Sequence, residues 1–205
     1  MVAAALGLAA CGGGQSGDGP AFGGAVPVTV GPESPVPTHP AVPTTVVGLR
    51  NVEYPQVAKT AKAKVINAAL MSDAEGLLSR QEACAVSTLR ADSAVLSFRW
   101  TCAGKGGLTA TFDTESGRAV TLADVLKPGF AAQLSATAIA QLEASGASPE
   151  EAAPAAPPKV EAFARWAVDT ESLQVTFTLR ARAVTISFPL ASLSSIIEQS
   201  GALGH

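Results

Sequence analysis

The residues of this chain that could support chemistry are few. Three cysteines stand at positions 11, 84 and 102, and the two histidines are His39 and His205. Both histidines fall outside the stretch expected to fold, so the positioned base that a serine or cysteine nucleophile needs is missing. Acyl transfer that depends on histidine is therefore nearly excluded. The same lack of histidine argues against a metal site at the cysteines.

Two carboxylates are candidates for glycoside hydrolysis, which requires a pair of acids flanking a cleft. They are Asp113 and Asp124, and each also has a simple structural role. Asp113 suits a turn, and Asp124 suits the first turn of a helix, where a negative charge is favourable. The run at residues 104–107 (GKGG) lacks the full spacing of a phosphate-binding loop and reads better as a hairpin loop. We predict no catalytic residue, no cofactor and no metal.

The N-terminal run is apolar from Val2 to Ala10 and ends at Cys11, which three glycines follow. Its last residues, LAAC, resemble the lipobox of bacterial lipoproteins, whose cysteine is diacylated. The resemblance implies a signal segment over residues 1–11 and a palmitate-type lipid anchor on Cys11. It places the protein on the extracytoplasmic side of the cell membrane or outer membrane. No basic residue precedes Cys11, so we expect a start codon upstream of Met1. The alternative is an alanine-rich N-terminus with one fortuitous cysteine.

Residues 12–44 are rich in glycine and contain seven prolines between positions 20 and 43. Proline excludes a regular helix and favours extended chain. We interpret the segment as a disordered tether that lifts a domain off the membrane, with a polyproline ligand for a partner as the alternative.

The remaining residues, 45–200, are roughly 160 in number, the size of one domain. The net charge is −3 and charged residues make up 15% of the chain. A general nucleic-acid binder would need a basic surface, so that class is disfavoured. No stretch after Cys11 is long and apolar enough to span a bilayer.

If Cys11 carries lipid, Cys84 and Cys102 remain as a pair, and an oxidising compartment favours their disulfide. Residues 83–89 and 94–102 read as two strands joined by a turn at residues 90–93. Antiparallel pairing about that turn brings the two cysteines opposite each other. Two reduced core thiols or a metal pair are the alternatives.

Hydrophobic periodicity and turn residues predict the other elements. Gln56–Arg80 has apolar residues at helical spacing, among them Val57 and Val65, and Thr121 suits the N-cap of a short helix with Asp124 behind it. The predicted strands are 45–53, ended by Tyr54-Pro55, then 108–113, 160–168, 173–179 and 183–188. The predicted helices are 56–80, 122–126, 130–144 and 190–198, with a turn at 114–117 and a loop at 145–158. Short hairpin connections favour an α+β fold, with an antiparallel sheet of about five to six strands and helices packed on one face.

A longer motif occupies residues 111–129 (TFDTESGRAVTLADVLKPG). It resembles the central motif of bacterial domain of unknown function 3298 (DUF3298), in which a strand ends in Phe-Asp, a glycine turn follows, and a Thr-Leu-x-Asp helix ends near Pro-Gly. The matching residues are Phe112, Asp113, Gly117 and Asp124. Residues 54–57 and 65–67 resemble the opening of the same family, so the similarity spans about 46–197.

The resemblance implies a domain that faces the cell exterior, as in lipoproteins and in the extracytoplasmic part of RsiV-type regulators. It implies binding or sensing more than catalysis, and in a regulator of that type the domain recognises lysozyme. This chain departs from the pattern in one respect. Trp100, Gly106 and Gly107 are kept, but the histidine that often follows them is absent, and no role of that histidine carries over.

Trp100 and Trp166 are the two tryptophans, and each follows an arginine, Arg99 and Arg165. Exposed Trp beside Arg suits a contact with a protein or carbohydrate, so these four residues form a candidate binding surface. Core packing is the alternative, because strand alternation puts Phe98, Trp100 and Phe112 on one face.

The sequence as a whole predicts a lipid-anchored envelope protein with a non-enzymatic binding or sensing domain. Its expected partners are the membrane, through Cys11, and a lysozyme-like protein or a wall glycan. The alternatives are an enzyme or enzyme accessory acting on peptidoglycan or another wall polymer, and a structural component of an envelope complex.

Overall fold

The computed structural model describes residues 39–103, 107–180 and 182–204. The predicted signal segment, the predicted lipidation site Cys11 and nearly all of the predicted tether lie outside these residues. The architecture below is that of the described residues, which belong to one compact unit. No helix in the described ranges has the length and apolar character to cross a membrane.

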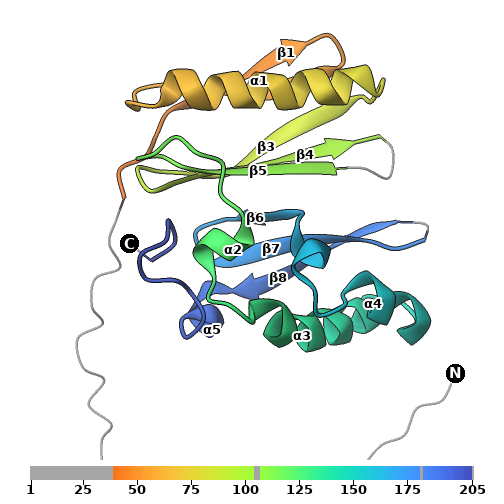
Figure 1. Cartoon of the computed structure of the whole chain (residues 1–205). Helices are drawn as coiled ribbons and strands as arrows, with labels where there is room; N and C mark the ends of the chain where they lie inside the picture. Colours follow the sequence, from red (N-terminus) through yellow and green to blue (C-terminus); the bar gives the residue numbers. More distant parts are fainter. Residues whose placement is uncertain (1–38, 104–106, 181, 205) are drawn as a thin grey trace, which may run out of the picture. The chain divides into compact units, whose positions relative to one another are not determined.

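The strands form two sheets, which stand one above the other in Figure 1. The first contains, in this order, β1 (Thr44–Leu49), β2 (Val52–Val57), β3 (Cys84–Ala91), β4 (Val95–Cys102) and β5 (Gly107–Asp113). The second contains β6 (Trp166–Val168), β7 (Ser172–Thr178) and β8 (Ala183–Pro189). All pairings are antiparallel except that of β2 with β3, which meet in parallel at Val52 and Cys84.

The helices are α1 (Ala63–Ser79), α2 (Leu122–Val125), α3 (Phe130–Ala144), α4 (Pro149–Ala155), the short 3₁₀ helix η1 (Val160–Phe163) and α5 (Leu190–Leu193). In Figure 1, α1 lies on the first sheet, and α3 and α4 lie beyond the second sheet, on the side away from the first. The α+β class is confirmed. The sheet is divided in two because β5 does not pair with β6; the N–H of Val168 in β6 instead donates to the Ser97 hydroxyl of β4, at 2.9 Å.

The core consists of two clusters that share strand β4. Leu96, Phe98 and Trp100 belong to the first cluster, together with the buried side chains of α1, which are Ile66, Leu70, Ala74 and Leu77. Val95 belongs to the second cluster, which includes Phe130, Phe163, Trp166 and Phe177. Alternate residues of one strand thus serve both cores, which explains why β4 is buried almost continuously.

The disulfide predicted between Cys84 and Cys102 is confirmed. The two residues face each other directly in the ladder of β3 and β4, with their Cα atoms 4.1 Å apart. The neighbouring N–H of Ala103 donates to the carbonyl of Ala83 at 3.0 Å. The bond therefore joins β3 and β4 at the end of the hairpin away from its turn.

The predicted strand 45–53 is wrong, because the chain turns within it and makes the hairpin of β1 and β2. Arg50 lies in the turn with φ of 57°. Tyr54 and Pro55 continue β2 instead of ending it, and Pro55 pairs with Val46 of β1. A proline is tolerated there because β2 contacts β3 through a single pair, so no ladder needs its missing N–H.

The predicted helix 56–80 begins later, at Ala63. Val57 is buried as predicted, but it belongs to strand β2 and not to the helix. The Asn67 side chain of α1 accepts from the N–H of Val57 at 2.7 Å and donates to the carbonyl of Val57 at 2.9 Å. These bonds hold the helix against the end of the strand. Val65, which the periodicity put on the apolar face, is 58% exposed.

Three other expectations are corrected. The predicted loop 145–158 contains α4, which starts with Pro149 at its first turn and has a capping box formed by Ser148 and Glu151. The predicted strand 160–168 is divided into η1 and β6, and the closing helix shortens to Leu190–Leu193. By contrast, α3 has the predicted bounds, and α2 follows the predicted N-cap Thr121.

Candidate functional site

The predicted binding surface around the tryptophans is not an exposed aromatic patch. Trp100 is 1% exposed and its indole N–H donates to the carbonyl of Glu53 at 2.7 Å. Trp166 is 4% exposed and belongs to the other core cluster. The alternative of core packing is therefore the observed one. The arginines bind neighbouring side chains instead: Arg99 donates to Gln174, and Arg165 donates to Thr178.

The motif residues shape the turn and helix that follow β5. Phe112 is buried, and the Asp113 carboxylate accepts from the N–H of Ser116 at 2.6 Å. Gly117 has φ of 72°, and a Cβ there would come within 2.7 Å of the Lys62 Cβ, so glycine is required on both counts. The hydroxyl and N–H of Thr121, at 2.7 Å each, hold the pKa of Asp124 below its usual range. All four residues thus have structural roles.

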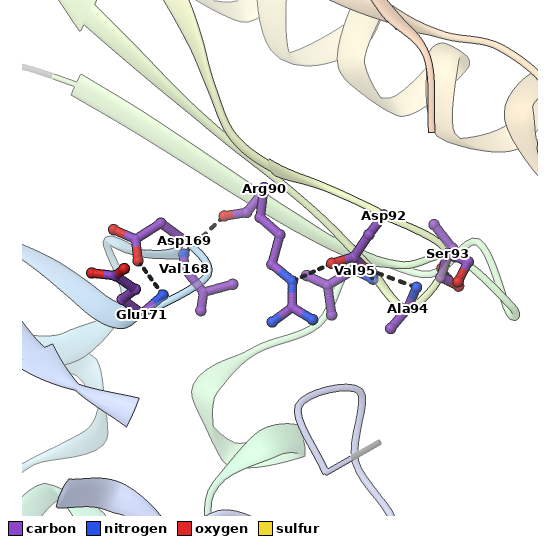
Figure 2. Close-up of polar contacts among 10 residues, drawn as sticks. Arg90, Asp92, Ser93, Ala94, Val95, Val168, Asp169 and Glu171 are labelled. Atoms are coloured by element: carbon purple, nitrogen blue, oxygen red, sulfur yellow. Dashed lines mark hydrogen bonds and ion pairs between the residues drawn. The ribbon is translucent and has the colours of Figure 1, made fainter. Parts of the chain in front are cut away.

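Polar groups also gather where the two sheets meet (Figure 2). Arg90 pairs with Asp92 at 2.6 Å, and the N–H groups of Ala94 and Val95 donate to the same carboxylate, each at 2.9 Å. Burial alone would raise the pKa of Asp92, but the bonds from Val95, Arg90 and Ala94 together lower it. The carboxylate therefore stays ionised and fastens the turn between β3 and β4.

Asp169 has the same character at the turn between β6 and β7. Burial alone would raise its pKa, and bonds from Glu171, Ser172 and Gln174 lower it. Gln174 in turn accepts from Arg99. Burial lowers the pKa of Arg99, and the negative charge of Asp169 raises it by a smaller amount. In the described ranges no buried side-chain nitrogen or oxygen lacks a partner. We interpret this network as a structural contact that holds the two sheets together.

A cavity of about 520 Å³ lies at the free edge of the first sheet. Its walls come from α1, from residues 109–112 of edge strand β5, from residues 119–122, and from residues 160–166 around η1 and β6. Phe112, Phe163 and Trp166 contribute aromatic surface, and most of the other lining residues are alanine, valine or leucine. Ala119 and Ala164 are exposed, so the cavity opens to solvent.

The charged side chains of the lining are both acidic: Asp73 from α1 and Glu161 from η1. Burial raises the pKa of Asp73. Neither carboxylate makes an ion pair or hydrogen bond with any side chain or backbone group that the structure describes. A volume of this size and a mainly apolar lining with a few polar groups are typical of ligand sites.

Of the lining residues, the sequence reasoning singled out Phe112 and Trp166 but neither acid, although one signal for Asp73 exists. Ile66, Leu70, Ala74 and Leu77 form the buried stripe of α1, and the partly buried Asp73 lies directly beside it, next to Ala74 in the sequence. A carboxylate on the apolar face of a helix indicates either a buried partner or a ligand. The residues of η1 carry no comparable signal, because they read as a strand.

No protein-family model and no curated protein matches this chain. Two solved structures are similar to it, each at 10% sequence identity. The first, from Bacteroides fragilis NCTC 9343, has a TM-score of 0.49 and is matched over 78% of this chain and 96% of its own. The second, from Pseudomonas aeruginosa PAO1, has a TM-score of 0.43 and is matched over 80% and 95%. Both are described as DUF3298 family proteins. The likeness assigns neither a ligand nor an activity.

Proposed function

We propose that this chain is a non-enzymatic binding or sensing protein of the cell envelope, and that the apolar part of its ligand occupies the cavity between α1, β5 and η1. The observation that carries the proposal is the cavity itself, about 520 Å³ of mainly apolar lining that opens to solvent. Burying an apolar group in such a site is favourable by about 25 cal/mol per Å² of surface removed from water.

A concave site suits a compact apolar group better than a broad flat contact. Large exposed hydrophobic side chains in the described ranges are few: Val46, Val65, Met71 and Val160. Val160 lines the cavity, and the other three lie on β1 and α1. A lysozyme-like protein or a wall glycan would therefore bind through one protruding group that enters the cavity, and a small ligand would bind there whole.

Filling the cavity should abolish binding without unfolding the domain. We expect the wild type to bind the neutral apolar dye N-phenyl-1-naphthylamine with a rise in fluorescence. Ala119→Trp and Ala164→Trp, whose exposed side chains line the cavity, should each weaken dye binding about tenfold or more, the loss expected when a ligand's buried apolar area is displaced.

The matched control is Ala140→Trp, an equally large substitution at an exposed position of α3 away from the cavity. It should bind the dye as the wild type does. Equal fluorescence titrations for all four proteins would show that the cavity is not the site, and the proposal would then fail.

Anchoring to the membrane is a separate part of the proposal, supported by the lipobox-like residues before Cys11 and by the disulfide, which is typical of exported proteins. Metabolic labelling with a palmitate analogue, in cells that express the chain from its natural start, should tag the wild type and leave Cys11→Ser untagged. Equal labelling of the two proteins would remove the anchor from the account.

An enzyme acting on wall polymers is the second candidate, and the presence of two carboxylates, Asp73 and Glu161, at one cavity favours it. A raised pKa, which burial gives Asp73, is a property of general acids. Wall-degrading activity in the purified wild type, lost in both Asp73→Asn and Glu161→Gln while the fold is kept, would replace the binding proposal by this one.

A further inference from the structure

Of the two acidic side chains that line the cavity, Asp73 is partly buried and Glu161 is exposed. Two other partly buried carboxylates have partners: Asp92 pairs with Arg90, and Asp169 accepts from Ser172 and Gln174. Asp73 is half-buried, and neither it nor Glu161 has a partner among the described residues. Taking a carboxylate out of water without a partner costs free energy, and proteins usually avoid it.

The placement of the two acids connects this cost to the cavity. Asp73 comes from α1 and Glu161 from η1, elements that are far apart in the sequence and that line the same cavity. Phe112, Phe163 and Trp166 line it as well. A bound group thus meets apolar surface together with two negative charges, and no lining side chain is positive.

From this complementarity we propose that the ligand of the cavity is a small organic cation with an apolar body, such as an alkylammonium or arylalkylammonium compound. The proposal rests on the proposed function and names its ligand class. The apolar body would displace water from the apolar walls, and the cationic head would donate hydrogen bonds to Asp73 and Glu161. Such a bond, to a charged acceptor, is stronger than one between neutral groups. Burial raises the pKa of Asp73, and a cation beside it would reverse that shift.

The test compares three probes of one chain length and different charge: n-octylammonium, 1-octanol and octanoate. Each is titrated into the full chain, and its affinity is measured by displacement of the naphthylamine dye. We expect octylammonium to bind about tenfold more tightly than octanol, as a hydrogen bond to a charged group allows, and octanoate to bind most weakly. Asp73→Asn should reduce octylammonium to the affinity of octanol and leave octanol unchanged.

Three further variants make the result specific. Glu161→Gln tests the second acid and should also weaken octylammonium, whereas Asp73→Glu keeps the charge and should restore most of the preference. Glu143→Gln removes an exposed acid of α3 that lies away from the cavity, and it should change nothing. Circular dichroism of each variant confirms that the domain is folded.

The outcomes separate this inference from the function on which it rests. Suppose that octylammonium and octanol bind equally, or that octanoate binds best, and that Ala119→Trp blocks the preferred probe. The proposed cationic ligand class is then wrong, and the cavity remains the ligand site. If an apolar peptide that contains lysine binds and free octylammonium does not, the proposal of a small-molecule ligand is overturned, and the ligand is a protein segment. If no probe binds, or Ala119→Trp has no effect, both the ligand class and the binding function fail.

Discussion

Replacing Cys84 and Cys102 together by alanine should lower the free energy of unfolding by about 3 kcal/mol, the chain-entropy value for a loop of this length. The two residues are separated by 18 positions in the sequence and face each other in the ladder of β3 and β4. The cross-link restricts the unfolded chain more than the folded one, so its removal mainly favours the unfolded state. Urea unfolding under oxidising conditions, followed by circular dichroism, measures the difference.

Reduction of the disulfide provides the control within the same protein. Dithiothreitol should bring the wild type close to the stability of the double alanine variant and leave the variant itself unchanged. A wild type whose unfolding midpoint does not respond to dithiothreitol, or a variant as stable as the oxidised wild type, would contradict a stabilising cross-link at these positions.

Truncating Phe163 to alanine should be the most damaging single substitution near the cavity, with a loss of about 3–5 kcal/mol, as is typical for buried phenylalanines. Its side chain is fully buried. It packs edge to face against Phe177, with ring centroids 5.6 Å apart, and against Phe130, at 6.3 Å. The substitution removes both ring contacts and leaves a void that the surrounding helices and strands fill only in part. Thermal and urea unfolding report the loss.

Val160→Ala is the matched control, because it lies in the same short helix and is 47% exposed. It should cost less than about 0.5 kcal/mol, the usual effect of a surface substitution. If Phe163→Ala lowered the free energy of unfolding no more than Val160→Ala does, the side chain of Phe163 would not be packed in the second core cluster. The described lining of the cavity would then be wrong at Phe163.

Local signals in the sequence were sufficient where one element satisfies its own backbone and side-chain requirements. The N-cap Thr121 with Asp124, the positive φ of Gly117 and the bounds of α3 all follow from capping, turn chemistry and helical period. The cysteine pair followed from the hairpin that brings β3 and β4 together. Each of these features depends on residues that are close in the sequence or opposite in one hairpin.

Long-range contacts decided the features that the sequence did not reveal. Pro55 reads as a strand breaker, but β2 keeps it because the pairing of β2 with β3 consists of one residue pair and does not need its missing N–H. Val57 and Val65 fit a helical period, and the bonds from Asn67 to Val57 show that the helix starts after the strand ends. The contact between the two sheets includes Ser97, a strand residue whose hydroxyl accepts from the N–H of Val168 in β6.

The candidate site was the least predictable part. Trp100 and Trp166, together with their neighbouring arginines, were the residues that drew attention in the sequence, and both indoles serve the core. Asp73 carried the better signal, as an acid that lies beside the buried stripe of α1. Its neighbours in the cavity come from four separate segments of the chain, and only the fold brings those segments together.

The most direct test of a ligand site in the cavity is to locate a bound ligand chemically. An octylammonium derivative with a photoreactive diazirine at its apolar end, irradiated with the full chain and mapped by peptide mass spectrometry, should label residues 109–112, 119–122 and 160–166. Excess octylammonium should prevent this labelling, and Ala119→Trp should abolish it. Labelling that is spread over the surface, or concentrated elsewhere and unaffected by Ala119→Trp, would contradict the account.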